Sequence, residues 1–152
     1  MKREKLTARL DSHVDTVASH SDTTKATRGR FGEDAAAEYL EHNGYIIKER
    51  NIRFGRHELD IIAEDDMYIV FVEVKTRTEA PENRLYTYGR PASAVTYEKR
   101  QNTVLAAREY LHRFPSSKRA RIDVIEVYLA RDNSSAPKVS KINHIRNAFG
   151  SR

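Results

Sequence analysis

The fold is decided by residues 58–76, which read ELDIIAEDDMYIVFVEVKT. Two runs rich in β-branched and aromatic residues, Leu59–Ala63 and Met67–Thr76, flank a short acidic turn, and this is the pattern of a β-hairpin. Residues 68–72 are apolar at every position, as expected for a strand that is covered on both faces. The segment therefore predicts a central hairpin in a sheet that has a layer on each side.

Regular elements are expected on either side of this hairpin. The alanine-rich stretch from Glu33 to about His42 predicts a helix, because it carries acids in its first turn and stops at Asn43-Gly44. The remaining expected elements are a strand over 45–53, a loop over 78–91, a helix over 97–112 capped by Thr96, a strand over 122–129 and a tail over 142–149. The order αβββαβ predicts an α/β fold with a mixed sheet flanked by helices.

Length and composition limit the class of protein. The 152 residues are enough for one domain with one hydrophobic core, expected over residues 29–152. Residues 1–28 are polar and rich in Ser, Thr and Asp, which predicts a flexible N-terminal extension. The sequence has no cysteine, no long apolar run and no secretory signal, so a cytoplasmic protein without membrane spans is expected.

Charge is distributed unevenly along the chain. Residues 1–76 carry 12 Lys and Arg against 15 Asp and Glu, a net charge of −3, whereas residues 77–152 carry 15 against 7, a net charge of +8. A basic half suits a polyanionic partner such as DNA. An ordinary charged surface would give the same totals, so charge alone does not decide between them.

The hairpin brings carboxylates and a lysine to one face. A two-residue loop at Asp65-Asp66 would pair Asp60 with Phe71, and every second residue along a strand shares a face. Asp60, Glu73 and Lys75 are then on the same side, with Glu58 opposite Glu73 and the backbones of Asp60 and Glu73 about 7 Å apart. A loop with an odd number of residues would place Asp60 on the opposite face instead.

This cluster predicts a divalent metal site. Like charges placed across strands destabilise a sheet, and Lys75 alone cannot balance three carboxylates. Oxygen-liganded Mg²⁺ or Mn²⁺ suits such a site, with Asp60 and Glu73 as the ligands. Lys75 can orient the attacking water or stabilise charge that develops on a phosphate. The alternative is a structural network of carboxylates and a lysine, and a bare E-x-K motif is common enough to allow it.

Three further residues are candidates. Glu33 is on the inner stripe of the first helix, where either the helix dipole or a nearby metal explains an acid. Lys99 and Arg100 on the second helix are candidates for holding a nucleic acid phosphate, although for each residue taken singly a solvated or snorkelling side chain is the commoner explanation. The loop over 78–91 also interleaves basic and aromatic residues, which is a weak signal for binding a nucleic acid strand.

The motifs resemble a known family. The blocks GEDAA (32–36), NGY (43–45), NIR (51–53), ELDIIA (58–63) and FVEVKTR (71–77), together with AF (148–149), are similar to the YraN-type family of bacterial endonuclease-like proteins. The resemblance covers about residues 29–149. It implies a restriction-endonuclease-like fold of the PD-(D/E)XK kind, distantly related to Holliday junction resolvases. The N-terminal extension is outside the pattern.

The resemblance also implies roles for individual residues. Asp60, Glu73 and Lys75 match the catalytic positions, and Glu33 matches a helix-borne acid of the resolvases. His57 departs from the pattern, because the family usually has glycine before the residue that corresponds to Glu58. A side chain at this position can alter the entry of the strand or narrow the site.

These observations lead to an expected function. We expect a metal-dependent endonuclease that hydrolyses DNA phosphodiester bonds, with branched or recombination-associated DNA among its candidate substrates. The alternatives are a non-catalytic DNA-binding module of the same fold and an adaptor that recruits a protein partner. A homodimer is compatible with the resemblance, because resolvase-like enzymes often act as dimers, but the sequence shows no clear dimer seam.

Overall fold

The computed structural model describes residues 20–79, 95–132 and 135–150. Its elements are α1 (His20–His42), β1 (Ile46–Phe54), β2 (His57–Glu64), β3 (Tyr68–Thr78), α2 (Tyr97–Arg113), β4 (Arg119–Leu129) and β5 (Val139–Ile145). Residues 1–19 of the predicted extension and most of the predicted loop over 78–91 lie outside the described residues.

The strands form one mixed sheet in the order β1-β2-β3-β4-β5. Neighbouring strands are antiparallel except β3 and β4, which run parallel over eleven paired residues from Tyr68–Arg119 to Thr78–Leu129. The connection between these two strands contains α2, as a parallel pair requires a crossover. The predicted α/β fold with a mixed sheet and flanking helices, consistent with a restriction-endonuclease-like core, is confirmed.

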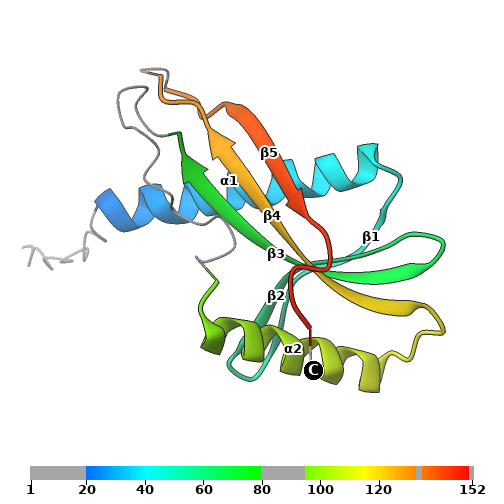
Figure 1. The fold of residues 1–152 in the computed structure, drawn as a ribbon. Coiled ribbons are helices and arrows are strands. Elements are labelled where there is room, and N and C mark those ends of the chain that lie inside the picture. Colours follow the sequence, from blue (N-terminus) through cyan, green and yellow to red (C-terminus); the bar gives the residue numbers. More distant parts are fainter. Residues whose placement is uncertain (1–19, 80–94, 133–134, 151–152) are drawn as a thin grey trace, which may run out of the picture.

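The two helices pack on opposite faces of the sheet (Figure 1). On one face Ala36, Ala37 and Leu40 of α1 meet Val70 and Val72 of β3. The other face has Ile69 and Phe71 of β3 against Val104, Ala106, Ala107 and Tyr110 of α2. Because successive residues in the first half of β3 pack on alternate sides, residues 68–72 are apolar at every position, as the sequence predicted.

The helix α1 begins earlier than the sequence indicated. A helix was expected from Glu33, but α1 starts at His20, so residues 20–28 of the expected extension are helical. Its early turns are polar and gain support from the sheet, because the Arg28 guanidinium donates a hydrogen bond to the Thr78 hydroxyl of β3. Further along, a Cβ on Gly32 would overlap the side chain of Thr76, so α1 and β3 approach closely only because residue 32 is glycine.

The C-terminal segment contains a strand where only a tail was expected. Residues 139–145 form β5, an edge strand that pairs antiparallel with β4. After β5 the chain turns at Asn147, which has a positive φ of 49°, and the Ala148 N–H donates to the Ile122 carbonyl oxygen at 2.8 Å. The end of the chain is thereby returned to the sheet beside β4.

Candidate functional site

The site lies where β2 and β3 separate. Their ladder ends at the pair Ile61–Val72, and the next residue on each strand is Asp60 on β2 and Glu73 on β3. The Val74 N–H donates to Asp60 Oδ2 at 2.8 Å, so the aspartate side chain binds a backbone N–H just beyond the last residue pair of the two strands. The divergence of two central strands thus brings two carboxylates to the same place.

The observed register corrects the predicted one. Asp60 was expected opposite Phe71, but Phe71 pairs with Ile62, a shift of two residues. The turn consists of Asp66 and Met67, because the Asp65 N–H donates to the Tyr68 carbonyl oxygen at 3.0 Å. A shift of two preserves the side-chain face, so Asp60 and Glu73 come together as side-by-side rather than diagonal neighbours.

Glu58 is not part of this cluster in the way the predicted register required. It pairs with Arg53 of β1, and its carboxylate oxygen Oε2 lies 3.5 Å from Arg53 Nη2. The position beside Glu73 belongs to Asp60 instead. The expectation that Glu58 lies opposite Glu73 is therefore wrong.

Two lysines contact the buried carboxylate of Glu73. The Glu73 side chain is 3% exposed, its Oε1 lies 3.0 Å from Lys75 Nζ, and its Oε2 lies 3.6 Å from Lys99 Nζ. Lys75 follows on the same strand, whereas Lys99 comes from the first turn of α2. That turn is fixed by its cap, since Thr96 Oγ1 accepts a hydrogen bond from the Lys99 N–H at 3.2 Å.

Asp60 has a strongly perturbed acidity. Burial and the nearby charge of Glu73 raise its pKa from 3.8 to about 7, and the charge of Glu33 adds to the increase. The hydrogen bond from Val74 and the charge of Lys99 act in the opposite direction but are weaker. The structure thus brings Asp60, Glu73, Glu33, Lys75 and Lys99 into one electrostatic cluster, and perturbed acidity of this kind is common at functional sites.

The other expected phosphate-binding residue, Arg100, makes different contacts. Its Nε donates to the Val95 carbonyl oxygen at 3.1 Å, and its guanidinium lies over the Phe149 ring at 5.6 Å from the centroid. It lines a cleft between α2 and the C-terminal segment rather than the cleft beside Lys75. Of the two candidates on α2, Lys99 is the one seen to contact Glu73.

A cleft of about 880 Å³ opens beside Lys75, between the early turns of α1 and β3. Its lining residues on α1 are Thr24, Lys25, Arg28, Gly29 and Glu33, and those on β3 are Val74, Lys75 and Thr76. The sequence analysis missed the α1 wall, because residues 20–28 were expected to lack regular structure. The signal was nevertheless present, since Lys25, Gly29 and Glu33 repeat every four residues, which places them on one face of a helix.

The carboxylates of the site are candidate ligands for a divalent cation. Among the described side chains, no group of three His, Asp or Glu residues is close enough together to hold a metal ion. Mg²⁺ does not require such a group, because it commonly keeps several waters and takes one or two carboxylates together with substrate phosphate oxygens. Asp60 and Glu73 supply two carboxylates, and the pKa of Asp60 is raised first by burial and then by the charge of Glu73, a shift that a bound cation would oppose. The residues therefore fit the ion.

A second buried carboxylate, Asp123 of β4, lies outside this site. Its Oδ1 accepts hydrogen bonds from Arg121 Nε at 2.9 Å and from the Asn147 N–H at 2.8 Å. Its Oδ2 lies 3.0 Å from Arg121 Nη2 and 2.7 Å from His144 Nε2. Burial acts to raise the pKa of Asp123, but the hydrogen bonds from His144, Arg121 and Asn147 outweigh it and hold the pKa below its usual value.

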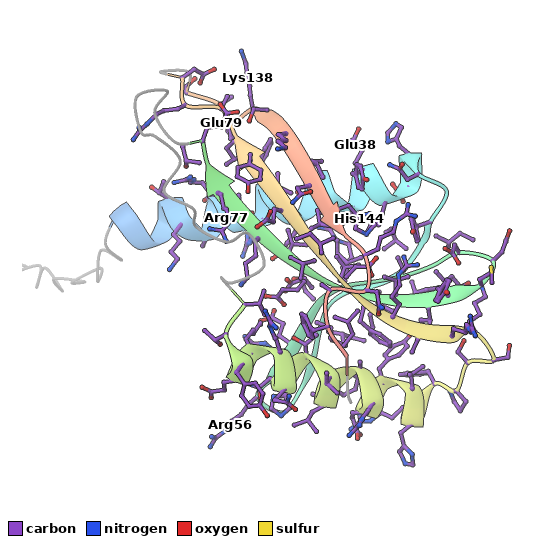
Figure 2. All side chains as sticks on the ribbon, viewed as in Figure 1. Glu38, Arg56, Arg77, Glu79, Lys138 and His144 are labelled. Carbon is purple, nitrogen blue, oxygen red and sulfur yellow. The ribbon has the colours of Figure 1, made fainter. Side chains whose placement is uncertain are left out.

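A third buried carboxylate, Glu126, lies on the part of the sheet that extends beyond α2. Its Oε2 accepts hydrogen bonds from Asn143 Nδ2 at 2.9 Å and from the Tyr128 hydroxyl at 3.2 Å, and its Oε1 lies 3.6 Å from Arg77 Nε. Figure 2 shows Arg77 on this part of β3, away from α2. These contacts come from β3, β4 and β5, so Glu126 joins the three strands across one face.

Comparison with known proteins identifies the family. Residues 32–127 match the model of the uncharacterised protein family UPF0102. The chain belongs to this family. It is the YraN family that the sequence motifs indicated, so the resemblance is confirmed.

Relatives in UPF0102 come from several bacteria. A UPF0102 protein of Clostridium botulinum is 42% identical over 123 residues, covering 80% of this chain and 92% of the relative. One of Bacteroides fragilis is 39% identical over 121 residues, covering 80% and 90%, and one of Caldanaerobacter subterraneus subsp. tengcongensis is 41% identical over 126 residues, covering 82% and 96%. In the UPF0102 chain described here, no helix within the described residues has the length and apolar character needed to cross a membrane.

Proposed function

We propose that this UPF0102 protein is a metal-dependent endonuclease that hydrolyses DNA phosphodiester bonds. The observation that carries the proposal is the meeting of Asp60 and Glu73 where β2 and β3 diverge, with Lys75 contacting Glu73. The raised pKa of Asp60 supports it, because excess negative charge in a buried position is the condition that a divalent cation relieves.

Each residue has a role in this proposal. Asp60 and Glu73 would hold Mg²⁺ or Mn²⁺, which supplies Lewis-acid activation of the phosphoryl group and lowers the pKa of water. Lys75 is 29% exposed and tied to Glu73, so its ammonium group is held at the border of the site, where it can orient water or stabilise charge on the phosphate. Lys99 contributes a second positive charge from α2, and Glu33 contributes a third acid from α1.

The substrate is proposed to be DNA on electrostatic grounds. The net charge is +5, and the positive excess lies in the half of the chain that contains α2 and β4. Basic surfaces gain affinity for DNA by releasing condensed counterions from its phosphates. Branched DNA is included among the candidates because the family resembles junction resolvases, and a comparison of DNA shapes tests this choice.

A second candidate function is a non-catalytic DNA-binding module. One observation favours it: both oxygens of Glu73 already face a lysine, so the protein supplies part of the countercharge that a metal would supply. In this case DNA binding would not require a divalent cation, and removal of the Asp60 carboxylate would leave binding intact.

The deciding experiment is cleavage of linear, flapped and four-way DNA with Mg²⁺ or Mn²⁺. Wild type is compared with Asp60→Asn, which keeps the shape of the side chain, and with Lys75→Met, which removes the ammonium group. We expect cleavage by wild type and a loss of at least about 100-fold in both variants, the scale of removing a group that stabilises the transition state.

Glu109→Gln is the matched control. It removes the same unit of charge as Asp60→Asn, but Glu109 forms a surface pair with Arg113 on α2, away from the site. It should cleave like wild type. Salt-sensitive DNA binding without metal-dependent cleavage on any substrate would overturn the nuclease and support the binding module.

A further inference from the structure

The early turns of α1 lie beside the candidate site but outside the segment that matches the family model. The UPF0102 match begins at residue 32, whereas α1 begins at His20. Figure 1 shows these turns, in blue, projecting past the part of β3 that β2 does not reach. Three turns of helix in this chain thus precede the family match and adjoin the end of β3 that carries Lys75.

This additional helix forms one wall of the cleft that is lined by two of the candidate residues, Glu33 and Lys75. The cleft of about 880 Å³ is lined on one side by Lys25, Arg28 and Glu33 of α1, and on the other by Lys75 of β3. Three cations and one carboxylate face the same space, which leaves an excess of positive charge. Gly29 lies between the charged residues, and a Cβ there would meet nothing within 4 Å, so this part of the cleft is open.

Arg28 is held in place by the sheet. Its Nη2 donates to the Thr78 hydroxyl near the end of β3, which ties the guanidinium to the same strand that carries Lys75. A guanidinium has five N–H donors, and this bond uses one of them. A phosphate can therefore be bound by donors that are already oriented, which lowers the entropy lost on binding. Lys25, one turn earlier, is exposed and adds a mobile charge.

We propose that Lys25 and Arg28 form a phosphate-binding site for the DNA backbone next to the phosphate that is cleaved. The proposal rests on the proposed function and deepens it, because it names the contact that positions the strand. Charge complementarity selects the occupant: Lys75 lines the cationic cleft and also contacts Glu73, so a polyanionic strand bound in the cleft lies beside the candidate site. Lys25 and Arg28 are positioning residues in this scheme.

The test measures binding separately from cleavage. Fluorescence anisotropy of labelled duplex and four-way DNA is followed in EDTA as salt is increased, for wild type, Lys25→Ala, Arg28→Ala and the control Arg30→Ala. Arg30 is exposed on the same helix but does not line the cleft. Loss of one phosphate contact should weaken binding about 5- to 10-fold near 0.1 M salt and reduce the slope of log K against log salt by about one.

We expect this effect for Lys25→Ala and Arg28→Ala, and less than about 2-fold weakening for Arg30→Ala, because charge far from bound phosphates acts only through a screened field. Thr78→Val should weaken binding without removing a charge, because it frees the Arg28 guanidinium. Circular dichroism checks that each variant is folded. If Arg28→Ala does not fold, Lys25→Ala still tests the proposal.

The possible results separate this proposal from the nuclease. If the two variants lose affinity and Arg30→Ala does not, the phosphate site stands, whether or not wild type cleaves DNA. Equal behaviour of all three variants would overturn the phosphate site while leaving metal-dependent cleavage untouched. Absence of DNA binding by wild type, or tighter binding of RNA duplex than of DNA, would also overturn it.

Discussion

Asp60 and Asp123 are both carboxylates within the sheet, yet their surroundings shift their pKa values in opposite directions. Asp123 accepts hydrogen bonds from Arg121, His144 and the Asn147 N–H, and its pKa is lowered. Asp60 accepts a hydrogen bond from the Val74 N–H, and burial together with the charges of Glu73 and Glu33 raises its pKa to about 7. Buried charge that is fully hydrogen-bonded supports a structure, whereas buried charge left unbalanced is available for a ligand.

Asp123 and Asp60 also differ in what they do for the strands around them. Asp123 links β4 to β5 and to the C-terminal segment through His144 and Asn147. Arg121 extends the link to β1, because its Nη2 donates to the Tyr45 hydroxyl just before that strand at 2.9 Å. Asp60 instead lies where two strands part. One region joins β4 to β5, to the C-terminal segment and to the start of β1, and the other lies at an opening between strands.

The largest expected effect comes from breaking the balanced carboxylate. Asp123→Ala leaves Arg121 without its buried partner and removes the acceptor for the Asn147 N–H. We expect the free energy of unfolding to fall by about 3 to 5 kcal/mol, as for other buried pairs that lose one member. Urea denaturation followed by circular dichroism at pH 7 measures it. Glu109→Ala, in an exposed pair, should lose no more than about 1 kcal/mol, and an equal loss in both variants would contradict the contrast.

The next expected effect is an increase in the free energy of unfolding, on removal of the Asp60 charge. In the folded protein the pKa of Asp60 is about 7, above its ordinary value of 3.8, so its contribution to stability is present at pH below 3.8 and is lost as pH rises towards and through 7. Asp60→Asn does not titrate and keeps an acceptor for the Val74 N–H. Without divalent cations the variant should therefore be more stable than wild type at pH 8 by about 3 to 4 kcal/mol, and nearly equal at pH 4.

Denaturation midpoints of both proteins from pH 4 to pH 8 test this expectation. The difference must grow with increasing pH. A constant difference would show that Asp60 titrates normally in the folded protein.

A smaller effect concerns the cation itself. At Mg²⁺ or Mn²⁺ concentrations ten times the dissociation constant, binding to the folded state should stabilise wild type by about 1.4 kcal/mol. Asp60→Asn should lose this stabilisation. Glu58→Gln should retain it, because Glu58 lies on the same strand but pairs with Arg53. Thermal unfolding at pH 8 with increasing metal concentration gives the answer, and equal metal effects in wild type and Asp60→Asn would place the ion elsewhere.

The smallest effect tests a single lysine. The charge of Lys99 lowers the pKa of Asp60, so Lys99→Met should raise it above about 7. Titration of the ¹³C-labelled Asp60 carboxyl carbon by NMR measures the change directly. Arg100→Met serves as a control, because Arg100 follows Lys99 in sequence but contacts Val95 and Phe149. An unchanged titration in Lys99→Met would remove Lys99 from the electrostatic cluster.

The sequence predicted the site better than it predicted the register. Side-chain alternation alone was enough to place Asp60 and Glu73 on one face, and an error of two residues does not alter that face. The register was missed because Asp65 was taken as a turn residue. In the structure Asp65 precedes the turn, and its Oδ1 accepts hydrogen bonds from the N–H groups of Met67 and Tyr68 at 2.8 and 2.7 Å. This role is common for aspartate in turns, so the signal was available.

Other features depend on tertiary contacts that no local pattern shows. The early turns of α1 are polar, and their support includes the hydrogen bond from Arg28 to Thr78, fifty residues later. The strand β5 is an edge strand with its first residues exposed, so its apolar alternation is weak. The buried pair Asp123–His144 joins two strands and gives no recognisable spacing in the sequence. The prediction of Thr96 as the N-cap of α2 is confirmed, because a cap depends only on residues that are close in the sequence.

The parallel pairing of β3 with β4 has a consequence for biosynthesis. Tyr68 pairs with Arg119, so β3 leaves the ribosome 51 positions ahead of its second partner, while β2 is already present. During that interval the apolar strand 68–72 has an edge that another nascent chain can join. We expect refolding yield to fall as protein concentration rises, and chaperones that bind extended apolar segments to protect this strand until α2 and β4 have been synthesised.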